Sequence, residues 1–160
     1  MTDTTAPIKG LLDDDARQIA GDALQATLVD LIDLSLIAKQ AHWNVVGVNF
    51  TAVHADLDEL VDVTREFSDA TAERATAIGV SPDGRSATVA KTTGARGIGE
   101  GWIGDTDTVS VIVENLAAVT GGIRERITAT GDVDPVTEDL LIGIAARLEQ
   151  LHWMWQARKA

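Results

Sequence analysis

The chain contains no cysteine, so it can form neither a disulfide nor a thiolate metal site, and it has no thiol nucleophile. No apolar run reaches the roughly 18 residues needed to cross a bilayer. The opening segment, MTDTTAPIKGLLDDD, is acidic and lacks the apolar stretch of a signal peptide. These absences favour a cytoplasmic protein without a membrane partner, in which any metal ligands are histidines or carboxylates.

Positive charge is also scarce, with 13 Lys and Arg against 25 Asp and Glu and a formal net charge of −12. An acidic surface repels DNA phosphates and anionic lipids, and it attracts cations. Many proteins are acidic only for solubility, so the charge favours a cation ligand without establishing one. The 160 residues, of which 45% are hydrophobic and 24% charged, fit one globular domain.

Apolar residues recur at three- and four-residue steps in four long stretches, and this period predicts helices. The expected helices run from Asp15 to about Val46, from Phe50 to about Ile78, from about Thr106 to Thr130, and from Pro135 to near Arg158. Short links join the members of each pair, and short links favour antiparallel neighbours.

A long connection, residues 79–104, separates the two helix pairs; it is rich in Gly, Ser and Thr and has room for a short helix at 88–91. Residues 1–15 are expected to be a lead-in and residues 16–158 the bundle. One long crossover between two helix pairs predicts an all-α, ferritin-like four-helix bundle.

The second expected helix carries two pairs of potential metal ligands, His54 with Asp58 and Asp69 with Glu73. Members of a pair are four residues apart, so they share a helical face. The pairs are separated by about 16 Å of helix, too far for one metal to contact both. If two copies of this helix pack antiparallel about a twofold axis near residues 63–64, the first pair of one copy faces the second pair of the other.

Simpler interpretations of these residues remain. Acids four residues apart commonly form a solvated helix face. A single histidine such as His54 is more often structural than a ligand, and His42 precedes an expected turn beside Trp43, where it fits a core position. Imidazole and carboxylate also suit iron, manganese and zinc alike. From the residues alone, a metal site is one interpretation among several.

Residues 38–58, AKQAHWNVVGVNFTAVHADLD, resemble the first signature of the Dps family, the starvation-induced miniferritins. The matching positions are His42, Trp43, Gly47, His54 and Asp58. Residues 69–82, DATAERATAIGVSP, resemble the second signature through Asp69, Ala72, Glu73, Arg74, Ile78, Gly79 and Pro82. Ser68 and Thr71 depart from the larger apolar residues usual there, and we expect these departures to change local packing only.

The resemblance implies a homo-oligomeric, dodecameric shell that oxidises Fe(II), preferably with hydrogen peroxide, and stores Fe(III) as mineral. Iron and peroxide are then the substrates, and their consumption protects DNA. The site implied is an intersubunit di-iron-type site: His42, His54 and Asp58 bind iron from one subunit, and Asp69 and Glu73 from the twofold-related subunit complete it.

Further roles follow from the same resemblance. Trp43 is expected either to lie beside the site and take up stray oxidising equivalents or to pack the core, and Arg74 is expected to hold a carboxylate through a bidentate contact. The acidic start of the fourth helix is expected near a threefold pore, where carboxylates steer cations, although an acid there can simply cap the helix. These acids are Asp132, Asp134, Glu138 and Asp139.

The alternative function is DNA binding, with compaction or physical shielding of the nucleoid as the main role. Lys9 is the only basic residue in the first fifteen, and the C-terminus offers Arg158 and Lys159. Phosphate binding needs several cations together, so DNA binding through the tails is expected to be weak. An inert shell, or a bundle used for protein contacts, is a further alternative, against which the five ligand positions argue.

Overall fold

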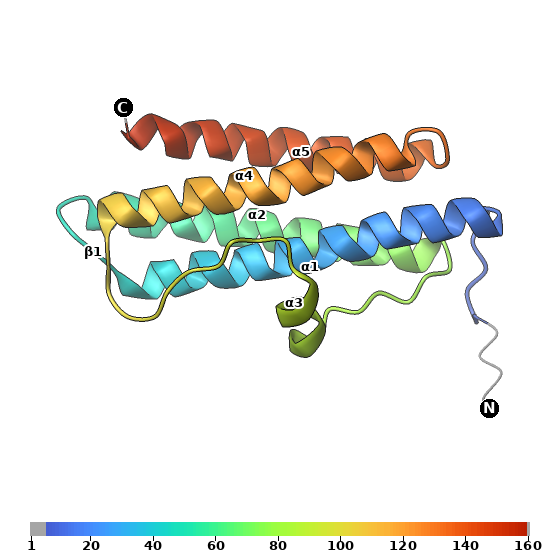
Figure 1. Ribbon diagram of the computed structural model, residues 1–160, viewed down its shortest axis with the longest axis horizontal. Helices are drawn as coiled ribbons and strands as arrows, with labels where there is room; N and C mark the ends of the chain where they lie inside the picture. The colour runs from blue at the N-terminus through green and yellow to red at the C-terminus, as the bar shows by residue number, and fades with distance from the viewer. Residues whose placement is uncertain (1–5, 160) are drawn as a thin grey trace.

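Four long helices lie side by side along one direction in the computed structural model, which describes residues 6–159 (Figure 1). Two short helices and two short strands complete the fold. The elements are α1 (Asp14–Asn44), β1 (Val45–Val46), α2 (Phe50–Ala77), α3 (Ser86–Thr92), β2 (Ile103–Gly104), α4 (Asp105–Thr130), α5 (Pro135–Gln156) and the 3-10 helix η1 (Ala157–Lys159). The expected all-α, ferritin-like bundle with one long crossover is confirmed.

The helix ends differ from the expected ones for local reasons. Helix α1 begins at Asp14 because the Asp13 side chain accepts a hydrogen bond from the Ala16 amide at 2.9 Å, an ordinary N-cap. It ends at Asn44, since Val45 and Val46 pair in parallel with Ile103 and Gly104. Of the expected lead-in, residues 1–5 lie outside the described residues.

The pairing of β1 with β2 sets the direction of α4. Strand β1 directly follows α1, and β2 directly precedes α4. The end of α1 and the start of α4 therefore meet at the same end of the bundle, as do the turn into α2 and the end of α5 (Figure 1). This end of the molecule collects chain segments that are far apart in the sequence.

The core runs along the bundle axis and is almost wholly aliphatic. Its fully buried side chains include Leu34, Leu57, Leu60, Ile112, Leu116, Ile144 and Leu148. Burying each such side chain contributes about 1.5–3 kcal/mol, so the core supplies the main stabilisation of the bundle. Within residues 6–159, no helix is both long enough and apolar enough to cross a membrane.

Two buried polar side chains hold the crossover against the bundle. Asp30 accepts hydrogen bonds from the Gly94 amide at 2.6 Å and from Arg126 at 2.7 Å. Asn115 accepts from the Arg96 and Gly97 amides at 2.8 and 3.0 Å. Both side chains are 1% exposed. The crossover is therefore a fixed part of the structure, and its course positions β2.

Candidate metal centre

His42, near the end of α1, and His54, in the second turn of α2, face each other across the α1–α2 turn. Their rings stack with centroids 3.7 Å apart and planes 22° from parallel. The ring of Phe50 lies 4.9 Å from that of His54. His42 is 8% exposed, so the two helices themselves enclose much of this pair.

Each histidine is oriented by the backbone of the other. His42 Nδ1 lies 3.0 Å from the His54 carbonyl oxygen, and His54 Nδ1 lies 2.9 Å from the His42 carbonyl oxygen. A carbonyl oxygen only accepts, so each Nδ1 carries a proton and donates it. In a neutral imidazole this leaves the Nε2 lone pair free, and a backbone partner on Nδ1 is the usual support of a metal-binding histidine.

Asp58 joins the histidine pair one turn further along α2. Its Oδ1 lies 3.3 Å from His42 Nδ1 and 2.5 Å from Lys39 Nζ. The hydrogen bond from Lys39 holds the pKa of Asp58 below its ordinary value; partial desolvation opposes this, and the positive charge of Lys39 adds to it. The carboxylate is thus ionised, but a metal that binds it must compete with an ammonium group.

Lys39 is the site residue that the sequence reasoning missed. It stands inside the quoted signature, three residues before His42, and residues three apart share a helical face. That spacing was the available signal. Lysine is a charge partner for Asp58 here and not a metal ligand.

Asp69 and Glu73 lie on the exposed side of α2, further along the helix from Asp58. Within residues 6–159, no three His, Asp or Glu side chains converge to hold a metal ion. The structure stacks His42 on His54 and sets Asp58 Oδ1 3.3 Å from His42 Nδ1, an arrangement short of a complete metal site among the described residues. It leaves Asp69 and Glu73 apart from them, as the helix rise requires within one subunit.

Trp43 is 64% exposed, so it does not pack the core of its own subunit. It follows His42 directly and points away from the interior. Of the two expectations for this residue, core packing is wrong, and a position beside the metal site stays a prediction.

Arg74 holds a carboxylate, but the contact differs from the expected bidentate one. Its Nη2 lies 2.6 Å from Asp134 Oδ2, while its Nε donates to Thr137 Oγ1 at 3.1 Å. Burial opposes ionisation of Asp134, yet the hydrogen bonds from Thr137 and Arg74 hold its pKa below the ordinary value. At 3% exposure, Asp134 is an interior partner of Arg74 and is poorly placed to line a pore.

The other acids near the site and the expected pore divide into engaged and exposed groups. Glu59 binds Arg147 of α5 at 2.7 Å. Asp62, Glu66, Asp132 and Asp139 are exposed, and Glu138 is partly exposed. A cation attracted to this surface therefore meets Asp62 and Glu66 more readily than Glu59.

Comparison with known proteins agrees with the signatures. A family model described as a ferritin-like domain matches residues 21–158. The chain is 37% identical over 158 residues to the DNA protection during starvation protein of Mycolicibacterium smegmatis, covering 96% of this chain and 84% of that protein. It is 37% identical over 139 residues to the fine tangled pili major subunit of Haemophilus ducreyi, covering 87% of this chain and 74% of that one.

A solved structure, that of Dps from Microbacterium arborescens in the high iron form, superposes with a TM-score of 0.89 at 29% identity, covering 94% of this chain and 97% of that one. The match extends over the helices that carry both ligand pairs. By the family model, the relatives and the bundle itself, this chain belongs to the Dps family of ferritin-like proteins.

Proposed function

We propose that this protein is a ferroxidase and iron-storage miniferritin, which oxidises Fe(II) at a site shared between twofold-related subunits and keeps the ferric product inside a dodecameric shell. The observation that carries the proposal is the histidine pair. Each Nδ1 is held by a backbone carbonyl, which leaves both Nε2 atoms free to bind iron, and the ionised carboxylate of Asp58 lies 3.3 Å from His42 Nδ1.

The exposed acids on α2 support the shared site. Asp69 and Glu73 repeat the four-residue spacing of His54 and Asp58, but they lie too far along the helix to reach the same metal in one subunit. A twofold axis near residues 63–64 places them opposite the histidine pair of the second subunit. Each dimer then has two identical sites.

The ligand set explains the chemistry. Carboxylate oxygens are hard donors that favour Fe(III) over Fe(II), so they lower the cost of oxidation. Each Fe(II) gives up one electron, and two such electrons with two protons convert one hydrogen peroxide to two waters without releasing hydroxyl radical. Few nitrogen ligands hold the ferric ion, so hydrolysis and transfer to the acidic inner wall can follow. Partly exposed Glu138 and exposed Asp139 at the start of α5 are the proposed cation-steering residues of the pore.

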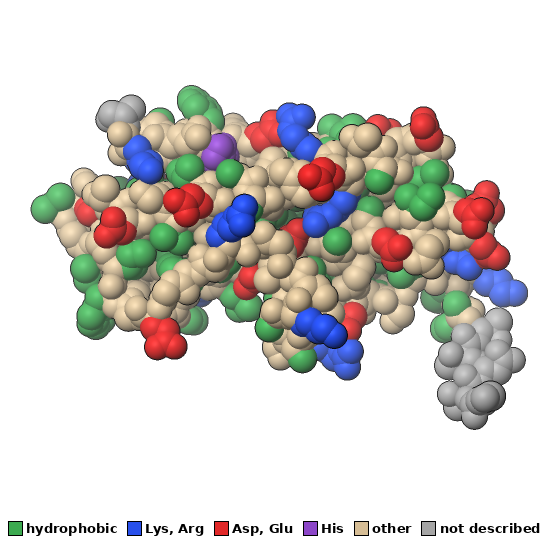
Figure 2. All heavy atoms as spheres, in the orientation of Figure 1, with side chains coloured by type: hydrophobic (Ala, Val, Ile, Leu, Met, Phe, Trp, Pro, Cys, Tyr) green, Lys and Arg blue, Asp and Glu red, His purple; other side chains and the backbone are tan. Residues whose placement is uncertain are grey.

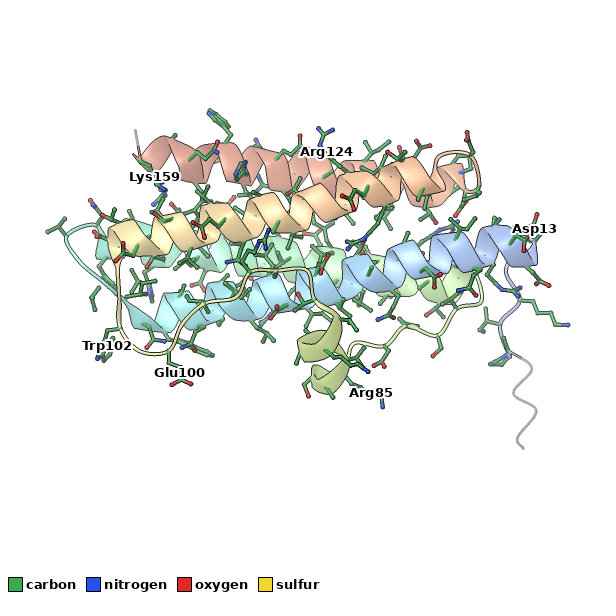
Figure 3. The ribbon with its side chains drawn as sticks, viewed as in Figure 1. Asp13, Arg85, Glu100, Trp102, Arg124 and Lys159 are labelled. Carbon is green, nitrogen blue, oxygen red and sulfur yellow. The ribbon has the colours of Figure 1, made fainter. Side chains whose placement is uncertain are left out.

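DNA binding is the second candidate, because relatives bear the name DNA protection during starvation protein. In this chain Arg158 is paired with Asp56 and lies over the Trp155 ring at 4.9 Å. Lys159 and the α1 start at Asp13 are at opposite ends of the bundle (Figure 3), and Lys and Arg side chains are scattered over the face seen in Figure 2 without a continuous basic patch. We therefore propose protection through iron and peroxide consumption. DNA retention in a salt titration that starts at low salt tests this, and strong retention would favour the second candidate.

The decisive experiment is Fe(II) oxidation, followed by near-ultraviolet absorbance of the ferric product, with peroxide and with air, on size-fractionated protein. We expect fast peroxide-dependent oxidation in a fraction of shell size. The double variant His54→Ala/Asp58→Ala should assemble but lose this reaction. A shell that oxidises no faster than buffer would instead leave a structural or DNA-associated role, and unchanged oxidation in the double variant would refute the assigned ligands.

A further inference from the structure

Strand β2 and the first residue of α4 both contact the turn between α1 and α2. Val45 and Val46 of the turn pair with Ile103 and Gly104. The next residue, Gly47, has φ +135°, a conformation that only glycine adopts readily. The turn ends at Asn49, where α2 begins. His42 and His54 stand on either side of this turn, so its shape sets how the two helices present them.

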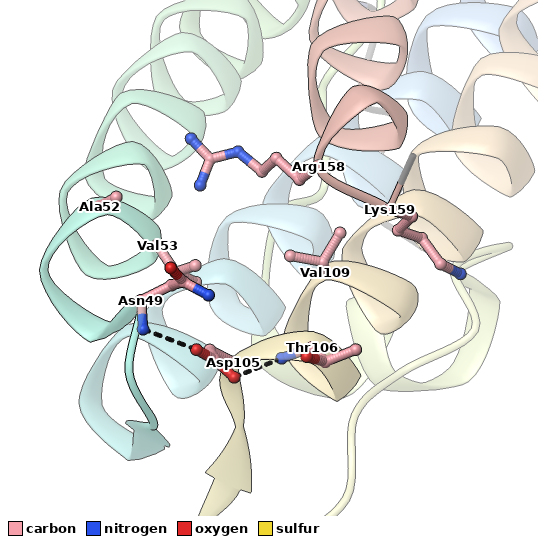
Figure 4. A pocket seen from close by; sticks show the side chains of 8 residues that line it. All are labelled: Asn49, Ala52, Val53, Asp105, Thr106, Val109, Arg158 and Lys159. Atoms are coloured by element: carbon pink, nitrogen blue, oxygen red, sulfur yellow. Dashed lines mark hydrogen bonds between the residues drawn. The ribbon is translucent and has the colours of Figure 1, made fainter.

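Asp105, the first residue of α4, makes the central contact with the turn. Its Oδ2 accepts the Asn49 amide at 2.7 Å, and its Oδ1 accepts the Thr106 amide at 2.8 Å. Both bonds are visible in Figure 4, with the carboxylate between the two helix starts. A Cβ on Gly47 would lie 2.6 Å from the Asp105 carboxyl carbon, so Gly47 is needed for close approach as well as for its φ.

We propose that Asp105 is a positioning residue for the iron site, which sets the relative placement of His42 and His54 by capping α2 from α4. The proposal rests on the proposed function for its catalytic meaning, while its geometric part stands without it.

The geometry of the α2 start explains why this cap matters. The first amides of a helix have no partner within the helix. Asn49 stands at the N-cap position of α2, but its side chain makes no capping bond. Asp105 therefore supplies from another element an acceptor for the backbone amide of that residue, and its negative charge also favours the positive ends of both helices. His54 is only five residues beyond Asn49, close enough to follow a shift of the helix start.

The histidine bonds are sensitive to such a shift because they are reciprocal. The two Nδ1–carbonyl distances, 3.0 and 2.9 Å, depend on the register of α2 against α1. A small axial or rotational movement of α2 lengthens one bond or both and changes the orientation of the two imidazoles. Loss of an outer-shell partner typically weakens metal affinity by about 10–100-fold, and we expect the loss of Asp105 to act in this range.

The test compares Asp105→Ala and Asp105→Asn with Asp107→Ala and Asp107→Asn. Asp107 is an exposed acid in the same first turn of α4, so its variants remove the same charge from the same helix end. Three quantities are measured on the assembled protein, well below the melting temperature of every variant. They are amide hydrogen exchange in residues 45–56, Co(II) affinity, and the separate kcat and KM for Fe(II) oxidation.

We expect Asp105→Ala to speed exchange in residues 45–56, to weaken Co(II) binding by about tenfold or more, and to raise KM more than it lowers kcat. Asp105→Asn keeps an acceptor oxygen and should recover most of the loss, while both Asp107 variants should resemble the parent. The proposal is overturned if Asp105→Ala leaves exchange unchanged, or if its Co(II) affinity and KM equal those of Asp107→Ala. Should the parent protein oxidise no Fe(II), the proposed function fails, but exchange and Co(II) binding still decide the positioning role.

Discussion

The two proposed ligand pairs on α2 are built in different ways. His54 and Asp58 sit among side chains of their own subunit: an imidazole stack, two Nδ1–carbonyl bonds and the ammonium of Lys39. Asp69 and Glu73 are exposed carboxylates on a helix face. The first half of the site is thus arranged in advance by one chain, whereas the second half has only its helix to orient it.

The contrast indicates which ligand pair would lose more conformational entropy when a metal binds. A ligand set held by backbone partners loses little freedom when metal binds. Exposed carboxylates lose side-chain entropy on binding, unless a second subunit already restrains them. On the proposed arrangement, contact with the second subunit would restrain Asp69 and Glu73.

The shared site is tested most directly by disabling its two ligand pairs in different subunits. His54→Ala/Asp58→Ala and Asp69→Ala/Glu73→Ala should each lose at least about 100-fold in oxidation rate, because losing ligands costs more than losing their outer-shell partners. Co-expressed in equal amounts, the two variants should recover about a quarter of the parent rate, since half the dimers are mixed and each mixed dimer has one intact site. Recovery is measured by stopped-flow oxidation after purification of the mixed shells.

Recovery near zero, with mixed shells verified by mass spectrometry, would show that both halves act within one subunit. Undiminished oxidation by Asp69→Ala/Glu73→Ala alone would show that the second pair is no ligand. As a control, the two variants are mixed only after each has assembled. In that mixture the subunits do not exchange, so no activity should return.

The second prediction concerns the ion pair between Arg74, the neighbour of Glu73, and Asp134. Asp134→Ala leaves Arg74 without its carboxylate partner in a largely buried place, and this should destabilise the fold by about 2 kcal/mol. The exposed neighbour Asp132→Ala should have almost no effect. Thermal or denaturant unfolding measures the difference. Equal stabilities for the two variants would mean that solvent replaces the Arg74 contact.

The third prediction sharpens the role of Lys39 in the well-ordered half. Lys39→Met removes the ammonium that competes with metal for Asp58, so Fe(II) and Co(II) should bind more tightly. Solvent screens a half-exposed ion pair, so the gain in affinity should be no more than a few-fold. Lys91→Met, an exposed substitution on α3, is the control. Weaker binding in Lys39→Met would show that Lys39 aids the orientation of Asp58 more than it competes.

The smallest effect is expected from pH at the turn. The hydrogen bond from the Asn49 amide holds the pKa of Asp105 below the ordinary value for an aspartate. A lowered folded-state pKa gives stability that is present above the unfolded value and lost as pH falls through the folded one. The difference in melting temperature between the parent and Asp105→Ala should therefore be constant from neutral to mildly acidic pH and shrink only below the ordinary carboxyl pKa. A difference that narrows already near neutral pH would contradict this assignment.

Much of the fold could be predicted from the sequence because helix periodicity and short links are local signals. The four helices, the crossover and the separation of the two ligand pairs all follow from spacing. The helix end at Asn44 did not, since the strand pairing that ends α1 involves residues 103–104, which are distant in the sequence. The contact of Asp105 with Asn49 could not be predicted for the same reason, since the two residues are 56 positions apart.

Side-chain roles were harder to predict than positions. Asp134 was expected at a pore because the family resemblance places this acidic region there, but its burial beside Arg74 depends on how α2 packs against α5. Arg74 itself was correctly expected to hold a carboxylate, although which one depended on tertiary contacts. Lys39 was readable from its spacing to His42, because both lie on one helix.

The reciprocal histidine bonds join residues only twelve apart, within a single helical hairpin, and such local contacts form early in folding. A newly made subunit can therefore present its nitrogen ligands before it meets another subunit. The carboxylates opposite them arrive only on dimerisation if the site is shared as proposed. On that proposal assembly would act as a checkpoint: an orphan subunit would offer only part of the ligand set, so oxidation would wait until a compartment begins to close around the product.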